Sequence, residues 1–525
     1  MTRRVAAWPV RAAWPVLVAW PVLAAWPMLA AVSVVLLLAV GGAGDSAATP
    51  GLGPGAGTPP WDLAAALGRT ATDGSAPLAS PWLVSAALVL AYLCGAGAVW
   101  LGLRATRDRP ALAGPAPRRL LLAGGVAALL LTLVPPVGSA DHLSYVAYGR
   151  ITAAGGDSYA VAPVDWRGGT DPVAGAVQPP WQHTPNVYGP VATQAFSLAA
   201  RLGGGSLRLT VWWWQLCCAL AFVAAGLLLD RAARGDPRAR LRAAVLWTAN
   251  PVLLGQLVLG AHVDVLAAGF AVAALVVLRP GSAAPGLPAT PRAPLPAAAR
   301  ALLAGVLVGA AAGTKAPYAL AGVAALWALP GPVARPAWWR SVGLGLLGAV
   351  AVLVPGYLWA GPHAFDQSRV AAGFTSIASP WRAVANLAGP VVGTGVVRAV
   401  LVPVAVLLAG WLAVRIGRRT ADPALALTAA WVLLAPYALP WYDALVWAPL
   451  ALCVAAVPQL EALLLARLTV LALAYLPGRV VGLTPSLEAV SLGFRRYVAP
   501  VLVLAAVAAT LRWSRPTPPA PPPAG

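Results

Sequence analysis

The stretch Trp82–Leu103, WLVSAALVLAYLCGAGAVWLGL, contains no charged side chain, and Arg104 follows it directly. About 20 consecutive apolar residues are enough to cross the hydrocarbon core of a bilayer as a helix. Because backbone amides in lipid must find hydrogen-bond partners within their own segment, such a stretch is expected to be helical. It therefore predicts a membrane-spanning helix with an arginine at one end.

Similar apolar segments recur along almost the whole chain of 525 residues, of which 60% are hydrophobic and only 10% are charged. A water-soluble domain carries about 25% charged residues, so this composition excludes an ordinary soluble protein. We predict an all-α, polytopic transmembrane helical bundle of about 12–14 spans. The predicted spans are 22–42, 82–103, 119–138, 207–229, 243–260, 263–278, 301–314, 316–330, 341–359, 391–414, 423–438, 441–457, 460–477 and 496–513.

The net charge of +20 comes almost entirely from arginine, since Lys315 is the only lysine. The arginines form short clusters between apolar segments, which argues against nucleic acid as a partner and is typical of cytoplasmic loops in multi-pass membrane proteins. A cytoplasmic N-terminus would place all four histidines and Lys315 on the outer side. The predicted cytoplasmic connections are then 104–119, 231–242, 279–300, 335–340 and 415–419.

The amino-acid composition divides the chain into five parts. The N-terminus repeats Ala-Trp-Pro and leads into an uncleaved membrane anchor, and the C-terminal tail is rich in proline and predicted to be disordered. The four cysteines lie in apolar segments, with neither metal-ligand spacing nor a disulfide framework. The predicted divisions are 1–42 (repeat and first anchor), 43–118 (external loop, second span, basic loop), 119–477 (main transmembrane domain), 478–514 (external loop, last span) and 515–525 (tail).

The longest predicted external connection, 139–206, is the most polar part of the chain. It begins within Gly138-Ser-Ala-Asp-His-Leu-Ser-Tyr-Val-Ala-Tyr-Gly-Arg150, where the third predicted span leaves the membrane. A carboxylate at the lipid–water boundary is partly desolvated, which raises its pKa towards neutrality. Asp141 is therefore a candidate general base that takes a proton from a sugar hydroxyl.

A structural interpretation of Asp141 competes with the catalytic one. Tyr145, Tyr148 and Ile151 recur at helical spacing and predict an amphipathic helix lying along the interface. An aspartate before such a run commonly caps the helix N-terminus. Both interpretations stay open from the sequence.

Aromatic and polar residues alternate in the rest of this loop, in Asp157-Ser-Tyr159 and in Trp181-Gln-His-Thr-Pro-Asn-Val-Tyr-Gly-Pro190. Aromatic rings beside amide, imidazole and carboxylate groups suit sugar binding, because a pyranose has apolar C–H faces and hydroxyl edges. The alternative is an ordered loop held by proline and glycine turns. The two interpretations are compatible.

Ionisable residues also occur at or near membrane depth, where they are costly and usually functional. His262-Val-Asp264 follows Asn250-Pro251, and Gly313-Thr-Lys-Ala-Pro317 places Lys315 between two short spans. A lysine suits a lipid phosphate as a point charge, although it can also extend towards the lipid head groups. Nothing demands a metal, but Asp264 and Asp141 could hold one if they met in space. Later external turns contain Ser379-Pro-Trp-Arg382 and Trp441-Tyr-Asp443.

At these residues the chain resembles the polyprenyl-phosphomannose-dependent alpha-1,6-mannosyltransferases of bacterial envelopes, a family of GT-C class membrane glycosyltransferases. The resemblance covers about 120 to 450, and the stretch His183–Pro190 carries most of its specificity. The chain departs from the family's sequence pattern at two places, and both bear on which acceptor it would use. Gly156-Asp-Ser-Tyr159 lacks the proline of the family's Gly-x-Asp-Pro-Tyr, and His142 is polar where the family has an aromatic or aliphatic residue.

The resemblance implies transfer of mannose from polyprenyl-phosphate-mannose to a mannan or lipoglycan acceptor. The reaction would occur on the outer face of the bacterial cytoplasmic membrane, without a cofactor or a nucleotide sugar, and with inversion at the anomeric carbon. Asp141 maps onto the catalytic base, and Lys315 and then Arg382 onto the donor-phosphate contacts. The candidate substrate-binding residues are His142, Tyr145, Tyr148, Asp157, Tyr159, His183, Tyr188, His262 and Asp264.

The alternative function is a transporter or flippase of a lipid-linked sugar. Its charged residues should line a path at mid-membrane and appear on both sides of it, often in related halves. Here the ionisable groups collect at one predicted face, and no internal repeat is visible beyond the Trp-Pro tract. This asymmetry favours an interfacial enzyme.

Overall fold

The computed structural model describes residues 14–52, 59–61, 80–108, 116–279, 295–329, 335–453, 455–478 and 483–515. Throughout these residues the regular structure is helical and no strand occurs, so the prediction of an all-α polytopic bundle is confirmed. The first Ala-Trp-Pro repeat and the proline-rich tail after Arg515 lie outside the described residues.

Nine helical segments within the described ranges are long and apolar enough to cross a membrane. Three shorter apolar helices accompany them: α10 (Asp264–Leu278), the segment Ala316–Leu326 that leads into α12 (Leu320–Ala328), and α17 (Pro423–Leu434). The nine are α1 (Trp14–Gly42, from Ala25), α3 (Pro81–Asp108), Ala116–Leu133 with α4 (Ala116–Leu130), α7 (Leu207–Ala232), Pro237–Leu259 with α8 (Pro237–Leu246) and α9 (Pro251–Leu253), α11 (Ala297–Thr314), α13 (Pro336–Ala360), α16 (Thr394–Thr420), and Pro485–Trp513 with α20 (Pro485–Gly493) and α21 (Ala499–Trp513).

Two predicted spans are not among the long apolar helical segments of the described residues. The spans expected at 441–457 and 460–477 correspond to α18 (Ala444–Leu452) and α19 (Pro458–Ala474). Every residue of α18 is buried by protein, and with nine residues it is too short to cross a bilayer by itself. Apolar composition alone cannot distinguish such a helix from a lipid-facing one.

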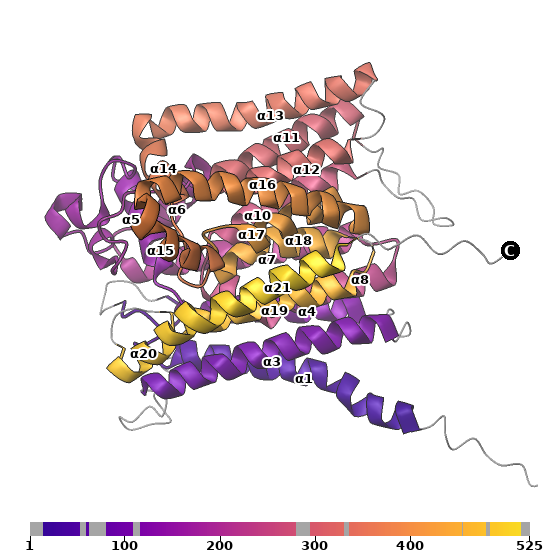
Figure 1. Cartoon of the computed structure of the whole chain (residues 1–525). Helices are drawn as coiled ribbons and strands as arrows, with labels where there is room; N and C mark the ends of the chain where they lie inside the picture. The colour runs from indigo at the N-terminus through magenta and orange to yellow at the C-terminus, as the bar shows by residue number, and fades with distance from the viewer. Residues whose placement is uncertain are drawn as a thin grey trace, which may run out of the picture.

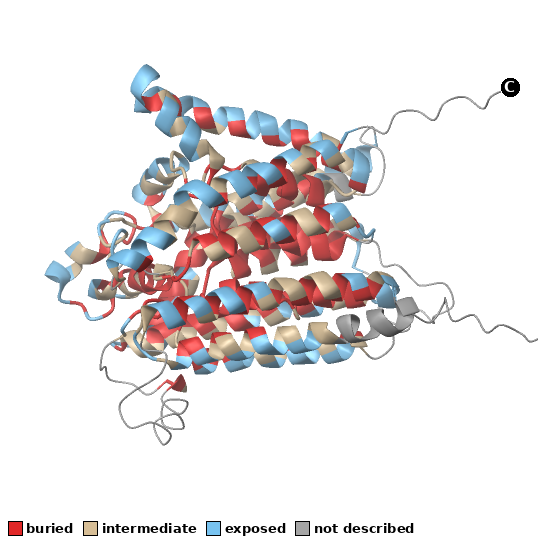
Figure 2. Cartoon of the chain, turned by 60° about the horizontal axis from the view of Figure 1, so that its bottom comes forward, coloured by how far each residue is buried: buried red, intermediate tan, exposed pale blue. Residues whose placement is uncertain are grey.

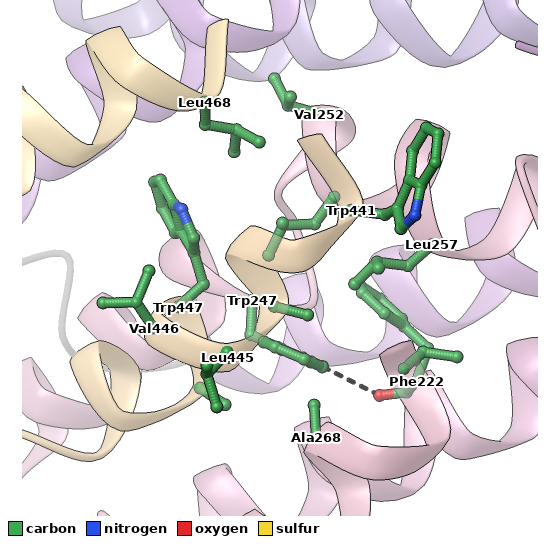
Figure 3. Packing of buried hydrophobic residues seen from close by; sticks show 14 of the residues in the cluster. Phe222, Trp247, Val252, Leu257, Ala268, Trp441, Leu445, Val446, Trp447 and Leu468 are labelled. Atoms are coloured by element: carbon green, nitrogen blue, oxygen red, sulfur yellow. Dashed lines mark hydrogen bonds between the residues drawn. The ribbon is translucent and has the colours of Figure 1, made fainter. Parts of the chain in front are cut away.

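The core lies where α7, α8, α10 and α18 meet. Figure 3 shows Trp247, Phe222 and Trp447 packed there among aliphatic side chains. The Trp247 ring stacks on Phe222 with ring centroids 5.2 Å apart, and its indole N–H donates to the Phe222 carbonyl oxygen at 3.0 Å. Figure 2 shows that buried residues concentrate in these central helices, whereas exposed ones cover the periphery.

The described parts of the predicted arginine-rich connections lie at one end of the bundle. Arg242 in α8 contacts Glu461 in α19, and Arg107 at the end of α3 reaches the same carboxylate at 3.8 Å. Arg279, after α10, donates to the Leu452 carbonyl oxygen. The opposite end holds α5 (Asp141–Ala153), α6 (Pro190–Gly203), α14 (Asp366–Ala372), α15 (Pro380–Val392) and α20 (Figure 1).

The helix predicted after Asp141 is present as α5, but its environment differs from the one expected. Its residues from His142 to Gly149 are all buried by protein. One close contact is with α6, because a Cβ added at Gly149 would meet the Phe196 carbonyl oxygen at 2.2 Å. The helix is therefore not amphipathic with one exposed face, as its spacing predicted, because neighbouring segments enclose it on all sides.

The Arg242–Glu461 pair generates a stability prediction. Its shortest contact is 2.7 Å, and Arg242 also donates to the carbonyl oxygens of Leu450 and Cys453. Arg242→Ala would leave a buried carboxylate short of its counter-charge, so we expect a loss of about 3–5 kcal/mol in unfolding free energy. Thermal and denaturant unfolding of the protein in detergent micelles measures this loss. Arg238→Ala, on the exposed side of α8, is the matched control; equal stability of the two variants would contradict the structural role of the pair.

Candidate active site

A cavity of about 330 Å³ lies at the bundle end that holds α5 and α6. Its walls come from α5, the loop before α6, the segment after α11, the end of α14 and the chain around the end of α17. The predicted site residues that line it are Asp141, Tyr145, Tyr148, Tyr188 and Lys315.

Asp141 is the first residue of α5, and its side chain is not used to cap the helix. Ala140 occupies the N-cap position without any side-chain cap, and the Asp141 backbone N–H donates to Ser139 Oγ at 3.0 Å. The N-cap interpretation is therefore wrong, and the carboxylate lines the cavity with 19% of its side chain exposed.

Burial raises the pKa of Asp141 to about 6. The positive charge of Lys315 and a hydrogen bond from Ser139 act in the opposite direction and limit the rise. A carboxylate with a pKa near 6 is ionised at neutral pH yet basic enough to accept a proton from a hydroxyl group in a transition state.

His262 stands behind Asp141 rather than in the cavity wall. Its Nδ1 is 3.9 Å from Asp141 Oδ2 and 3.3 Å from the Tyr145 hydroxyl oxygen, and its ring stacks on Trp441 with centroids 3.6 Å apart. It follows a π-helical segment, Leu254–Leu259, and a turn in which Ala261 has a φ of 51°. π-Helical turns and left-handed non-glycine residues often accompany functional sites, because their cost must be offset by surrounding contacts.

Lys315 and Asp264 form a buried ion pair. Lys315 Nζ lies 2.8 Å from both carboxylate oxygens of Asp264 and 3.4 Å from the centroid of the Tyr442 ring. The lysine is only 8% exposed, so the alternative in which it extends to the lipid head groups is wrong. Two of its three N–H donors are committed to one carboxylate.

The loop before α6 and the end of α11 cross closely at two glycines. Gly189 lies against Gly313: a Cβ added at Gly189 would meet the Gly313 carbonyl oxygen at 2.2 Å. The Gly189 backbone N–H also donates to the Thr314 carbonyl oxygen at 3.3 Å. Because Tyr188 and Lys315 adjoin this crossing, it places both at the same cavity.

Other predicted site residues have contacts elsewhere. Asp157 accepts from the Tyr159 backbone N–H at 2.8 Å and lies 3.0 Å from His363 Nδ1, so it shapes its own loop. The Tyr159 hydroxyl lies 2.8 Å from Thr193 Oγ1. His183 is exposed, while His142 is fully buried, and neither lines the cavity.

Arg382 lies in the wall of a second cavity, of about 300 Å³, beside the first. Asp264 is paired with Lys315, and among the residues that the structure describes no group of three His, Cys, Asp or Glu side chains is positioned to hold a metal ion.

Several cavity residues were not singled out as site residues from the sequence. Trp181 and Tyr442 lie in the predicted external turns Trp181–Pro190 and Trp441–Asp443, where their aromatic side chains are the sequence signal for the site. Phe374, Trp431 and Tyr437 gave no signal, because single aromatic residues in an apolar chain do not reveal which cavity they face.

Comparison with known proteins identifies the family of the chain. The family model described as "Alpha-(1->6)-mannopyranosyltransferase, N-terminal domain" matches residues 32–331, which is more than half of the chain. The chain belongs to this family. The match includes Asp141, His262, Asp264 and Lys315, whereas the cavity walls after α13 lie beyond it.

A similar protein carries a name that matches this family. "Alpha-(1->6)-mannopyranosyltransferase B" of Corynebacterium glutamicum is 30% identical over 183 residues, which are 35% of this chain and 30% of that protein. The aligned part is thus under a third of the relative's length. No solved structure matches the chain.

The glycine crossing can be tested in this family member. Gly189→Ala adds a methyl group where 2.2 Å is available, so Tyr188 and Lys315 should separate although the backbone conformation itself suits alanine. We expect at least a tenfold loss of transfer activity and a lowered melting temperature, measured on the purified protein. Gly205→Ala, where no atom lies within 4 Å of the added methyl, should match the wild type. A fully active Gly189→Ala variant would contradict the crossing.

Proposed function

We propose that this protein transfers mannose from polyprenyl-phosphate-mannose to a mannan or lipoglycan acceptor and forms alpha-1,6 linkages. The observation that carries the proposal is the position of Asp141, whose pKa is raised to about 6, in an aromatic-walled cavity of a chain that belongs to the alpha-(1→6)-mannopyranosyltransferase family.

The proposed reaction is a direct displacement. Asp141 takes the proton of the acceptor hydroxyl as that oxygen attacks the anomeric carbon of the donor mannose. The bond from the anomeric carbon to the phosphate oxygen breaks, its electron pair leaves with the polyprenyl phosphate, and the anomeric configuration inverts. A base held at the site converts proton removal into an intramolecular event, which contributes to the rate.

The cavity walls suit two sugar rings. Tyr145, Tyr148, Tyr188 and Trp181 line one part, and Tyr442 lies over Lys315 in another. Flat aromatic rings can cover the apolar C–H faces of a pyranose, and their hydroxyl and indole groups can bond its edges. Tyr145 is held by edge-to-face packing against Tyr188 at 5.1 Å and by stacking on Phe196 at 5.2 Å, so this wall is preformed.

The proposed role of Lys315 is electrostatic. Its charge lowers the pKa of Asp141 and so favours the ionised base, and Lys315 is part of the cavity wall that a donor phosphate would approach. Because Asp264 already binds two of its protons, Lys315 can neutralise only part of a phosphate charge. Arg382 in the neighbouring cavity is the second proposed phosphate contact.

The proposed location of the site is the outer face of the bacterial cytoplasmic membrane. The cavity lies at the bundle end opposite the arginine-rich connections, and arginine-rich loops generally stay in the cytoplasm. A lipid-borne sugar can enter such a site while its isoprenoid tail remains in the bilayer.

Asp141→Asn tests the proposed function. With labelled polyprenyl-phosphate-mannose and an oligomannoside acceptor, we expect kcat to fall ~10²–10⁴-fold at unchanged expression, because the amide cannot accept the proton. For the wild type, kcat/KM should rise with pH and level off above a midpoint near 6, since the base works only when deprotonated. Asp165→Asn, an exposed carboxylate in the same loop, is the control.

Two results would contradict the proposal in different ways. Normal transfer by Asp141→Asn would remove Asp141 as the base. Wild-type protein that moves the labelled lipid across vesicles without forming any glycosidic bond would instead support a flippase.

The orientation has its own test. In a cysteine-free background, Thr170→Cys in the outer loop should react with a membrane-impermeant maleimide on intact cells, whereas Arg234→Cys should react only after lysis. Both positions are exposed; Thr170 lies between α5 and α6 and Arg234 between α7 and α8, and α5 and α6 lie at the opposite end of the bundle from α8 (Figure 1). The reverse pattern would invert the proposed topology.

A further inference from the structure

The second cavity adjoins the first one. Phe374, Val402 and Tyr437 line both cavities and form their shared wall. Beyond this wall the second cavity of about 300 Å³ lies between α15 and α16, and its lining there includes both polar and apolar side chains. The polar and basic lining residues are Thr375, Arg382, Asn386, Thr394 and Arg398.

The two arginines of this cavity are available to a ligand. Neither the Arg382 nor the Arg398 side chain makes an ion pair or hydrogen bond recorded for the described residues, and no acidic side chain lines the cavity there. Lys315, by contrast, is held by Asp264. Two guanidinium groups in one cavity without a counter-charge favour an anion, above all a phosphate, which arginine binds in a bidentate manner.

The surroundings indicate that the anion belongs to a lipid. Leu387 and Val391 on α15 are 78% and 82% exposed, and Val396 and Val400 on α16 are also exposed. These exposed apolar residues lie on the same two helices that supply the cavity's arginines, on faces turned away from the lining residues. A ligand with an anionic head in the cavity and a long apolar chain against these helices can therefore satisfy both surfaces.

We propose that Arg382 and Arg398 bind the phosphate of the polyprenyl-phosphate carrier, with its isoprenoid chain along α15 and α16 and its sugar directed past Phe374 and Tyr437 to Asp141. This inference rests on the proposed function and assigns the main donor-phosphate contact to these two arginines instead of Lys315.

Binding of the carrier without sugar tests the site separately from catalysis. The probe is labelled polyprenyl phosphate, added to the full-length protein in phosphatidylcholine nanodiscs. Arg382→Gln and Arg398→Gln should each weaken binding about tenfold, and the double variant should weaken it further. Asp141→Asn should bind the carrier like the wild type, and so should Arg369→Gln, an exposed arginine of α14 outside both cavities.

Kinetics with the complete donor give a second readout. Each arginine variant should raise the donor KM about tenfold while lowering kcat much less, and replacement by lysine should restore part of the affinity. Because both side chains are exposed, the variants should retain the wild-type melting temperature.

The competing sources of phosphate are distinguished by competition. Displacement of the carrier by inorganic phosphate at equal concentration would assign the site to a soluble anion. Equal displacement by phosphatidylglycerol would assign it to lipid head groups in general. Either result would overturn the proposal, and so would unchanged carrier binding by the double variant. Arginine-dependent carrier binding by a wild-type protein that forms no glycosidic bond would uphold the binding site and refute only the proposed transferase function.

Discussion

The buried ion pair between Lys315 and Asp264 is the contact on which the architecture of the site depends. The lysine follows the last turn of α11, and the aspartate is the first residue of α10. A cation at a helix C-terminus and an anion at a helix N-terminus both interact favourably with the helix dipoles. Removing either partner would leave an uncompensated charge in a protein interior, so the pair keeps the two helix ends together.

Around this pair, the site consists of helix ends and interruptions. The backbone between α9 and α10 passes through a π-helical segment, α11 stops at Thr314, and α17 stops at Leu434. In an apolar chain, irregular backbone is tolerated where protein buries it or where it lines a polar cavity. The same interruptions free side chains from helix faces, which is how Lys315 and the Tyr437–Tyr442 region reach one cavity with Asp141.

Much of the fold was predictable because hydropathy is a local property. The helical character, most spans and the common end of the arginine-rich loops all agree with the structure. The differences share a cause: α18 was expected to be a long span and α5 an amphipathic helix with one exposed face, but α18 has only nine residues and protein encloses both helices. A side chain's apolar character does not say whether lipid or another helix covers it.

For the candidate site, the sequence determined which residue types were available: a very apolar chain with one lysine, few acids and a polar loop that begins near Asp141. Tertiary structure decided which of them meet. Lys315 and Asp264 are 51 positions apart, and Tyr145 and His262 are 117 apart. Such contacts depend on helix crossings like that of Gly189 on Gly313, where the absence of a side chain sets the distance. Local pattern can mark polar residues as unusual, but only packing between distant segments decides whether they share a cavity, as Asp141 and Lys315 do, or stabilise a loop, as Asp157 does.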